Sequence, residues 1–432
     1  MSKKNLSIFY SNALRDEDLV TDRMRHKFRK QHGRDWTDFA DIEGLGGHHT
    51  FEYTLKPRAL DKNFVADLQK NEINSQLISS IDPRITDVVF ITMPLTSDLY
   101  LRSFNQKKAL NALARTTKDF LLKEEAADKY ENIVIGWGGY TKLTTKHGLL
   151  TTDQSIWGDL FTTGVMNGVN VARPNQVNNT HGDTGTSSMI LSSMKKSGAS
   201  DEDCLIISGV HGPVGGAVLR KAFDKSHPFN LNFKKVVLIT DGHKEGPRFD
   251  KISQLKNEVE SYFNIKDRVI LAEDVKTAFA SCKEAKYFLC AGSADGMVPE
   301  LFPAGTVIFD YSSPRGFRTS QGWVEKNILV LSAGYAEVAD KGFSLLEGSL
   351  DKQEGWLDIG AHGDYSHWGC FAETISRAAL SLKDNSIGQK IEIDEINRTY
   401  EIMTLAGFHE THPYSLDVRL SGWDEVKKFL SK

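Results

Sequence analysis

The stretch CLIISGVHGPVGGAVLRKAF, Cys204–Phe223, decides the fold. It begins with a short apolar run typical of a buried strand and ends with a run of helical composition. Gly209, Gly212 and Gly215 lie at the junction. Glycines in this position let the backbone approach a pyrophosphate, and the N-terminus of the following helix offers unpaired N–H groups. We therefore expect these glycines and Val214 to bind a cofactor; the alternative is a tight turn without a ligand.

The rest of the middle region extends this pattern. It contains short, apolar, β-rich runs separated by gaps of which several are long enough for a helix: DCLIIS, KVVLIT, RVILA, KYFLCA, GTVIFDYS and NILVLSAG. Apolar strands that alternate with helices predict a parallel sheet covered on both faces. The predicted fold is α/β, with a central doubly wound Rossmann-type parallel sheet, an N-terminal α/β domain and a mostly helical C-terminal segment.

The same patterns divide the chain into four consecutive parts. Residues 1–85 form an N-terminal extension of unclear role, and residues 86–200 form an α/β substrate domain. Residues 201–335 form the NAD(P)-binding domain, and residues 336–432 form the helical segment.

The end of the second strand of this domain, LITDGHKEGPR, bears on the choice of cofactor. Asp241 lies 26 residues beyond Gly215, where a carboxylate favours the ribose hydroxyl of NAD. His243, Lys244 and Arg248 could instead neutralise the 2′-phosphate of NADP. These residues leave both cofactors open.

Composition excludes several classes of partner. The 432-residue chain has a net charge of −4, which gives no electrostatic signature of nucleic-acid binding. No run approaches the roughly 20 apolar residues of a membrane helix, and the apolar stretch near the N-terminus is too short for a signal peptide. We expect a cytoplasmic protein with no membrane span and no nucleic-acid partner.

The four cysteines are scattered and lack C-x-x-C spacing, which argues against a disulfide framework and against a cysteine zinc site. The histidines at His48–His49 and in HETH, His409–His412, do not give the i, i+4 pair of a zinc helix. The sequence therefore predicts no metal and a reducing compartment.

Cys370 differs from the other cysteines. If a helix begins there, it lies on a different face from an apolar stripe formed by Phe371, Ile375, Ala378 and Leu382. A helix N-terminus lowers the pKa of a thiol, and His362 or His367 could assist, so Cys370 is a candidate nucleophile. Glu373 is expected to stabilise the helix dipole. The alternative is a small packing residue in a domain contact.

Several short motifs, taken in order, resemble one known family. They are IGWGGYTKL around Gly138, Gly139 and Tyr140, THGDTGTSS from Thr180, IFDYSSPRGF through Asp310, Pro314 and Arg315, NILVLSAGYAEV, and GCFAET with Cys370. Over roughly residues 87–415 the chain resembles the cyanobacterial-type long-chain acyl-acyl-carrier-protein reductases. It departs from the family's pattern at Asp183 and Gly185, and at Thr240 and Asp241, where the family has an Ala-Arg pair.

The resemblance implies an enzyme that reduces an acyl thioester, carried by acyl carrier protein or coenzyme A, to a fatty aldehyde. It implies NADPH as the cofactor, with NADH possible. The aldehyde is either released or passed to a downstream enzyme that uses it. The resemblance also implies Cys370 as the nucleophile and the following substrate-binding residues: Gly138, Gly139, Tyr140, Thr184 and Thr186.

Two other functions stay open. One is an NAD(P)-dependent dehydrogenase of a small substrate, without covalent catalysis and with a structural Cys370. The other is a sensor that binds NAD(P) and catalyses nothing. A basic cluster at Asp22–Arg34, which includes Arg25, Lys27 and Arg29, is either a solvated helix face or a docking patch for an acidic carrier protein.

Overall fold

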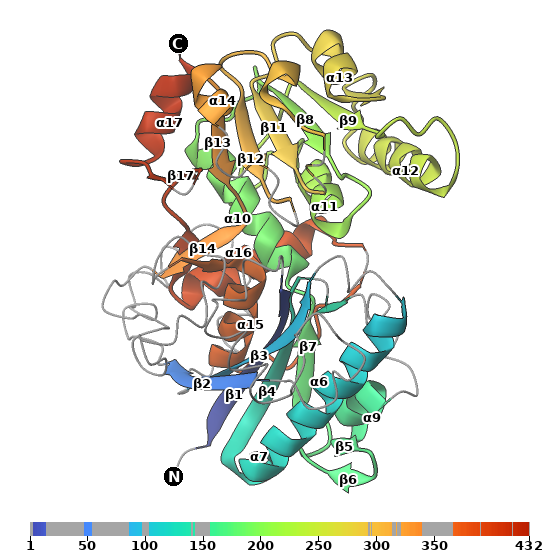
Figure 1. Ribbon diagram of the computed structural model, residues 1–432, viewed down its shortest axis with the longest axis vertical. Helices are drawn as coiled ribbons and strands as arrows, with labels where there is room; N and C mark the ends of the chain where they lie inside the picture. Colours follow the sequence, from blue (N-terminus) through green and yellow to red (C-terminus); the bar gives the residue numbers. More distant parts are fainter. Residues whose placement is uncertain are drawn as a thin grey trace, which may run out of the picture. The chain divides into compact units, whose positions relative to one another are not determined.

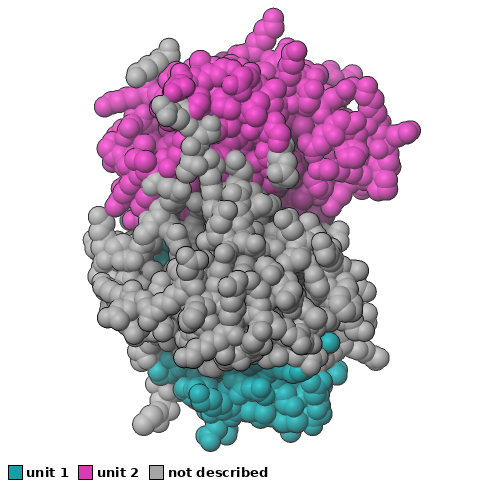
Figure 2. Space-filling model, viewed as in Figure 1, with its two compact units in different colours: residues 1–182, 338–389, 401–408 teal, residues 183–337, 390–400, 409–432 magenta. Residues whose placement is uncertain are grey.

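A computed structural model describes residues 3–13, 47–53, 86–96, 103–139, 141–142, 156–292, 294, 296–312, 317, 321–338, 366–388, 390–416 and 418–431. The chain forms two compact units, coloured separately in Figure 2. Unit 1 contains Met1–Gly182, Val338–Gln389 and Glu401–Phe408. Unit 2 contains Asp183–Glu337, Lys390–Tyr400 and His409–Lys432. The four consecutive parts expected from the sequence differ from this grouping, because each unit is built from segments far apart along the chain.

In its described part, unit 2 contains a parallel sheet whose strands follow the predicted apolar runs (Figure 1). The strands are β8 (Cys204–Ser208), β9 (Lys235–Ile239), β10 (Val269–Ala272), β11 (Tyr287–Cys290), β12 (Val307–Asp310) and β13 (Leu329–Ser332). Their spatial order is β10-β9-β8-β11-β12-β13, extended by the short antiparallel strands β17 (Tyr414–Ser415) and β18 (Val418–Arg419). Ranked along the chain, the parallel strands have the order 3-2-1-4-5-6 of the doubly wound dinucleotide-binding fold. The predicted fold class is confirmed.

Both faces of this sheet are buried, which explains why its strands are apolar without a polar alternation. On one face Leu205 and Leu238 pack against helices α10 (Asp183–Lys196), α11 (Pro213–Lys221) and α12 (Pro247–Tyr262). On the other face Ile206 and Val237 pack against α13 (Val275–Ser281) and α14 (Gln321–Glu325). The unit also contains the 3₁₀ turn η4 (Pro299–Leu301) and the C-terminal helix α17 (Trp423–Leu430).

Unit 1 is built on a second sheet with the strand order β2-β3-β1-β4-β7. Its strands are β1 (Lys4–Ala13), β2 (Gly47–Tyr53), β3 (Thr86–Thr96), β4 (Tyr130–Trp137) and β7 (Val177–Thr180), parallel except for β2. Its other described elements include α6 (Ser103–Lys123), α7 (Ala126–Lys129), α9 (Ile156–Thr163) and the hairpin of β5 (Val165–Met166) and β6 (Val169–Asn170). Residues 1–85, expected to form an extension, therefore supply β1, which pairs with two parallel neighbours.

Strand β1 was not predicted from the sequence because polar residues interrupt its apolar run. Asn5 and Ser7 are fully buried within it. The Nδ2 of Asn5 donates to the carbonyl oxygen of Ala378 at 2.7 Å. The side chain of Asn5 therefore contacts a helix from the C-terminal part of the chain.

That helix, α15 (Gly369–Ala379), packs on β1 and β4. A Cβ atom added at Gly136 of β4 would lie 2.0 Å from the Oγ1 of Thr374, so glycine is needed for this close approach. The remaining described elements are β14 (Tyr335–Val338), β15 (Ser366–Trp368), α16 (Ile393–Leu405) and β16 (Phe408–Glu410). The predicted C-terminal segment is thus shared between the units, with α15 in unit 1 and α17 in unit 2.

None of the helices in the described parts of the chain combines the length and the apolar composition needed to cross a membrane.

Candidate functional site

The glycine loop joins β8 to α11 at the carboxyl edge of the unit 2 sheet. Gly209 has φ +76°, a conformation that favours glycine. A Cβ atom on Gly209 would lie 2.6 Å from the backbone carbon of Ala291 and from the amide nitrogen of Gly292, which follow β11. A Cβ atom on Gly215 would lie 2.7 Å from the carbonyl oxygen of Gly209. These two glycines therefore let the loop pack closely on its own sheet and helix.

Gly212 has a different surrounding. It is the N-cap of α11, with extended φ −78° and ψ 163°, and no side-chain hydrogen bond caps the helix start among the described residues. Among the described residues, and apart from its chain neighbours and its own helix backbone, the one atom within 4 Å of a Cβ added there is the carbonyl oxygen of Gly209, at 3.3 Å. Val214 packs its side chain into the core, so its contribution to ligand binding is confined to its backbone amide. The helix start offers N–H groups and a positive dipole end to an anion.

The predicted ribose-binding carboxylate lies just beyond β9. Asp241 has φ +53° and is followed by Gly242 with φ +76°, so the chain turns sharply there. The Nη2 of Arg248, on α12, donates to the Oδ2 of Asp241 at 2.5 Å. The Nε of Arg248 donates to the Nδ1 of His211 at 3.3 Å. A chain of contacts thus links the glycine loop to the carboxylate.

His211 is a residue of this site that the sequence did not single out. Burial, with a smaller contribution from the Arg248 charge, lowers the pKa of His211 from 6.5 to about 4. The imidazole is therefore neutral near pH 7, as its acceptor role toward Arg248 requires. The one sequence feature that could have pointed to His211 is its position between two glycines of the loop. A histidine there does not by itself predict a role in a glycine loop.

The other two residues predicted to contact a 2′-phosphate lie nearby on the surface. His243 is exposed and its amide donates to the carbonyl oxygen of Thr240 at 3.1 Å. The Nζ of Lys244 lies 2.8 Å from the Oε1 of Glu273, which raises the pKa of Lys244 above its usual value. Asp241 thus faces Arg248, and Lys244 faces Glu273, so both cations have a carboxylate partner.

Cys370 lies in the first turn of α15, close to where the sequence predicted the helix start. It is 8% exposed. Gly182, with φ +68°, lies directly against it: a Cβ atom there would be 2.2 Å from the Cβ of Cys370. The Oγ1 of Thr374 donates to the carbonyl oxygen of Cys370 at 2.8 Å. Cys370 therefore lies at a helix N-terminus, packed so closely on Gly182 that a side chain at position 182 would collide with it.

The rest of α15 differs from the expected amphipathic helix. Every residue from Gly369 to Ala379 is buried, so the face that carries Cys370 is as buried as the apolar stripe, and Leu382 lies beyond the helix end. The expected role of Glu373 at the helix dipole is wrong, since Glu373 lies beyond the first turn. Its Oε1 accepts from the Oγ1 of Thr180 at 2.7 Å and lies 4.0 Å from the Nη1 of Arg377.

His367 is completely buried three residues before Cys370. Neither of its ring nitrogens has a hydrogen-bond partner among the described residues, and its ring lies edge-on to Phe371 with centroids 5.9 Å apart. Burial lowers the pKa of His367 from 6.5 to about 3. The imidazole is therefore neutral near pH 7, and its burial opposes protonation.

The predicted substrate residues have different surroundings. In unit 1, the amide of Gly138 donates to the carbonyl oxygen of Tyr10 at 2.8 Å, and Gly139 has φ +54°. In unit 2, Thr184 and Thr186 are buried in the first turn of α10, and Thr186 lies against Gly334 beyond β13. The following predicted residues lie outside the described part of the chain: His362, Tyr140, Pro314, Arg315 and the Asp22–Arg34 cluster with Arg25, Lys27 and Arg29.

Comparison with known proteins adds little to this site. No family model matches the chain, and no curated protein matches it. Among solved structures, a short-chain alcohol dehydrogenase from E. coli CFT073, crystallised with NADH, shares 15% sequence identity with a TM-score of 0.24. The match covers 35% of this chain and 42% of the dehydrogenase, less than half the length of either.

The buried, unpartnered His367 makes a testable contribution to pH dependence. Because its pKa is about 3 in the folded chain and 6.5 in the reference state, the unfolded chain takes up a proton first as the pH falls. Stability is therefore retained above about pH 6.5 and lost progressively toward pH 3. When the pH is lowered from 7 to 5, the free energy of unfolding of His367→Leu should fall by about 2 kcal/mol less than that of the wild type. Urea unfolding at the two pH values measures it, and an unchanged loss would contradict the assignment.

Proposed function

We propose that this chain is a nicotinamide-dinucleotide-dependent oxidoreductase whose cofactor binds to unit 2. The observation that carries the proposal is the position of the glycine loop. It follows β8, the strand at which the order β10-β9-β8-β11-β12-β13 reverses direction. In open α/β sheets, ligands bind at the carboxyl edge of such a reversal. The backbone contact of Gly209 with Ala291 and Gly292 fixes the loops on either side of this point.

The residues present fit a dinucleotide. The space beside Gly212 and the N-terminus of α11 suit a pyrophosphate, since a side chain is absent where the phosphates would approach. Asp241 would accept a hydrogen bond from a ribose hydroxyl, whereas Arg248 would pair with a 2′-phosphate. Arg248 and Asp241 already pair with each other. NADH would bind if its ribose hydroxyl displaces Arg248 from Asp241, and NADPH would bind if its 2′-phosphate displaces Asp241 from Arg248. The bound nicotinamide would supply the hydride.

The specific reaction that we propose is the reduction of an acyl thioester to an aldehyde, as the resemblance to the acyl-acyl-carrier-protein reductases implies. The Cys370 thiolate attacks the thioester carbonyl carbon, the carbon–sulfur bond to the carrier breaks, and the carrier thiolate leaves. The resulting cysteinyl acyl-enzyme gains a hydride at the carbonyl carbon. The hemithioacetal then collapses, which releases the aldehyde and restores the Cys370 thiolate.

Two features of unit 1 support this role for Cys370. Its position in the first turn of α15 lets the helix dipole stabilise a thiolate. The close packing of Gly182 against the Cβ of Cys370 fixes this residue at the helix start. His367, with a pKa of about 3, is a poor base for the thiol proton at neutral pH. Acyl carrier protein and coenzyme A are the two thioester carriers that the resemblance implies.

Gly212→Asp tests cofactor binding without disturbing the fold. Asp is a preferred N-cap residue, and the extended backbone suits it once the carbonyl oxygen of Gly209, 3.3 Å from the new Cβ, shifts by a few tenths of an ångström, so α11 should stay folded. The new carboxylate would repel the pyrophosphate. The Kd for NADH and NADPH should therefore rise at least about tenfold, a loss of about 1.4 kcal/mol. Cofactor fluorescence and thermal unfolding measure the two effects.

Gly216→Ala is the matched control. A Cβ atom there would make ordinary contacts at 3.4 Å with Arg220, Leu255 and Val210, so alanine fits within the helix. This variant should bind the cofactor normally and gain about 0.5–1 kcal/mol in stability. Normal binding by Gly212→Asp, or no binding by the wild type, would contradict the proposed cofactor site.

Covalent catalysis is tested by intact-protein mass spectrometry after incubation with long-chain acyl-coenzyme A and no reductant. The wild type should gain one acyl group, which peptide mapping should place on Cys370, and Cys370→Ala should gain none. Added NADPH should discharge the adduct as aldehyde.

Cys290→Ala is the control for the acylation experiment, because Cys290 is fully buried within β11. It should acylate like the wild type. If the wild type binds NADPH but forms no adduct with any thioester, the covalent mechanism is wrong, and a dehydrogenase without covalent catalysis or a sensor becomes the better assignment.

A further inference from the structure

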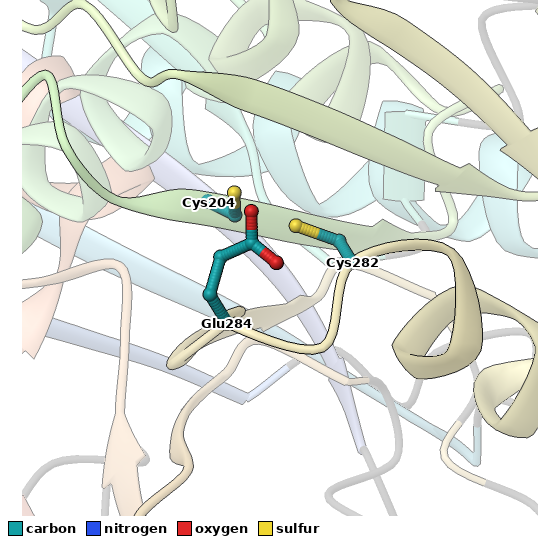
Figure 3. Close-up of side chains that lie close together, drawn as sticks. All are labelled: Cys204, Cys282 and Glu284. Atoms are coloured by element: carbon teal, nitrogen blue, oxygen red, sulfur yellow. The ribbon is translucent and has the colours of Figure 1, made fainter.

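Two buried cysteines and a glutamate come together in unit 2, away from the glycine loop. Cys204 is the first residue of β8, Cys282 is the C-cap of α13, and Glu284 lies in the turn that leads to β11. The two Sγ atoms and a carboxylate oxygen all lie within 4.8 Å of one another. Figure 3 shows the carboxylate of Glu284 beside the two sulfur atoms.

The backbone around this cluster is well ordered by hydrogen bonds. The amide of Cys282 donates to the carbonyl oxygen of Ala278 at 3.1 Å, and the amide of Ala285 donates to the carbonyl oxygen of Cys282 at 3.1 Å. Cys204 is aligned with Lys235 of β9 in the sheet. The cluster therefore lies at the amino edge of the sheet, whereas the glycine loop follows the carboxyl end of β8.

The thiols interact as a pair. A hydrogen bond from Cys282 lowers the pKa of the Cys204 thiol, and the same hydrogen bond, together with burial, raises the pKa of Cys282. Two cysteine sulfur atoms and a carboxylate oxygen within 4.8 Å of one another are a donor set that zinc binds through sulfur and oxygen.

Charge and access also suit a cation. Two thiolates and a carboxylate carry one negative charge more than Zn²⁺ neutralises. Nearby lysines offset it, since the Nζ of Lys234 lies 3.8 Å from the Oε1 of Glu284 and Lys235 is the partner of Cys204 across the sheet. Cys204 and Cys282 are at most 1% exposed, but Glu284 is exposed, which gives an ion a route from solvent.

We propose that Cys204, Cys282 and Glu284 form a Zn²⁺ site with a water molecule in the fourth position. A tetrahedral zinc ion with Zn–S bonds of about 2.3 Å holds its ligand atoms about 3.5–4 Å apart, so little movement is needed. Binding displaces the protons of both thiols. The site ties β8 to the turn after α13 at the edge of the sheet opposite the glycine loop. The metal-free expectation rested on spacing along the chain, and these cysteines are 78 residues apart.

The test is a Co²⁺ titration of the reduced, chelator-treated full chain, followed by displacement with Zn²⁺. The wild type should bind one equivalent of Co²⁺ with the near-ultraviolet sulfur-to-cobalt absorption of thiolate ligation, and Zn²⁺ should remove that absorption. Cys282→Ser should lose it. Glu284→Gln, a surface change that leaves the core intact, should keep the thiolate absorption but weaken Co²⁺ affinity at least about tenfold.

Cys290→Ser is the matched control, because Cys290 is buried in the same apolar cluster as Cys204 and Cys282. It should titrate like the wild type. The proposal is overturned if the wild type shows no thiolate absorption with Co²⁺, if Cys282→Ser retains it, or if Glu284→Gln binds as tightly as the wild type. Circular dichroism of each variant confirms that a loss reflects the ligand and not unfolding.

Discussion

The close contact between the backbone of Gly209 and the chain at Ala291 and Gly292 is the constraint on which unit 2 depends. These residues follow β8 and β11, the neighbouring strands where the order of the sheet reverses. Any side chain at Gly209 would force the two strand ends apart. Because they stay together, α11 can begin directly above the edge of the sheet with its amide groups directed at ligand space. The proposed cofactor site is a consequence of this packing.

Close backbone packing at glycines also occurs in unit 1, around the candidate nucleophile. Gly182 lies against Cys370, and Gly136 lies against Thr374, so α15 sits close to its sheet along its length. Some of its buried polar groups pair with distant segments, as Glu373 does with Thr180. Others have no partner in the described region, among them the Nε of Arg377 and, just before the helix, both ring nitrogens of His367. A buried polar group without a partner costs free energy, and His367 carries that cost three residues before the candidate nucleophile.

Sequence reasoning succeeded where the signal is local. The strands of unit 2 are continuous apolar runs, and the glycine loop lies between a strand and a helix in the printed order of residues, so the fold class could be predicted. Strand β1 was missed because the buried polar residues Asn5 and Ser7 break its apolar pattern; Asn5 does so for a hydrogen bond to distant Ala378. The polar residues of α15 predicted an exposed helix face, whereas every residue from Gly369 to Ala379 is buried. The approach of Cys204 to Cys282 depends on the packing of α13 and leaves no trace in cysteine spacing.

The central claim is that the β8–α11 loop of unit 2 binds a nicotinamide dinucleotide. Hydrogen–deuterium exchange of the full chain, with and without saturating NADH or NADPH, tests it most directly. The account predicts slower exchange in peptides that cover Gly209–Ala217 and Thr240–Phe249, with no change in α17. No protection with either cofactor, or protection that leaves the glycine loop unchanged, would contradict it.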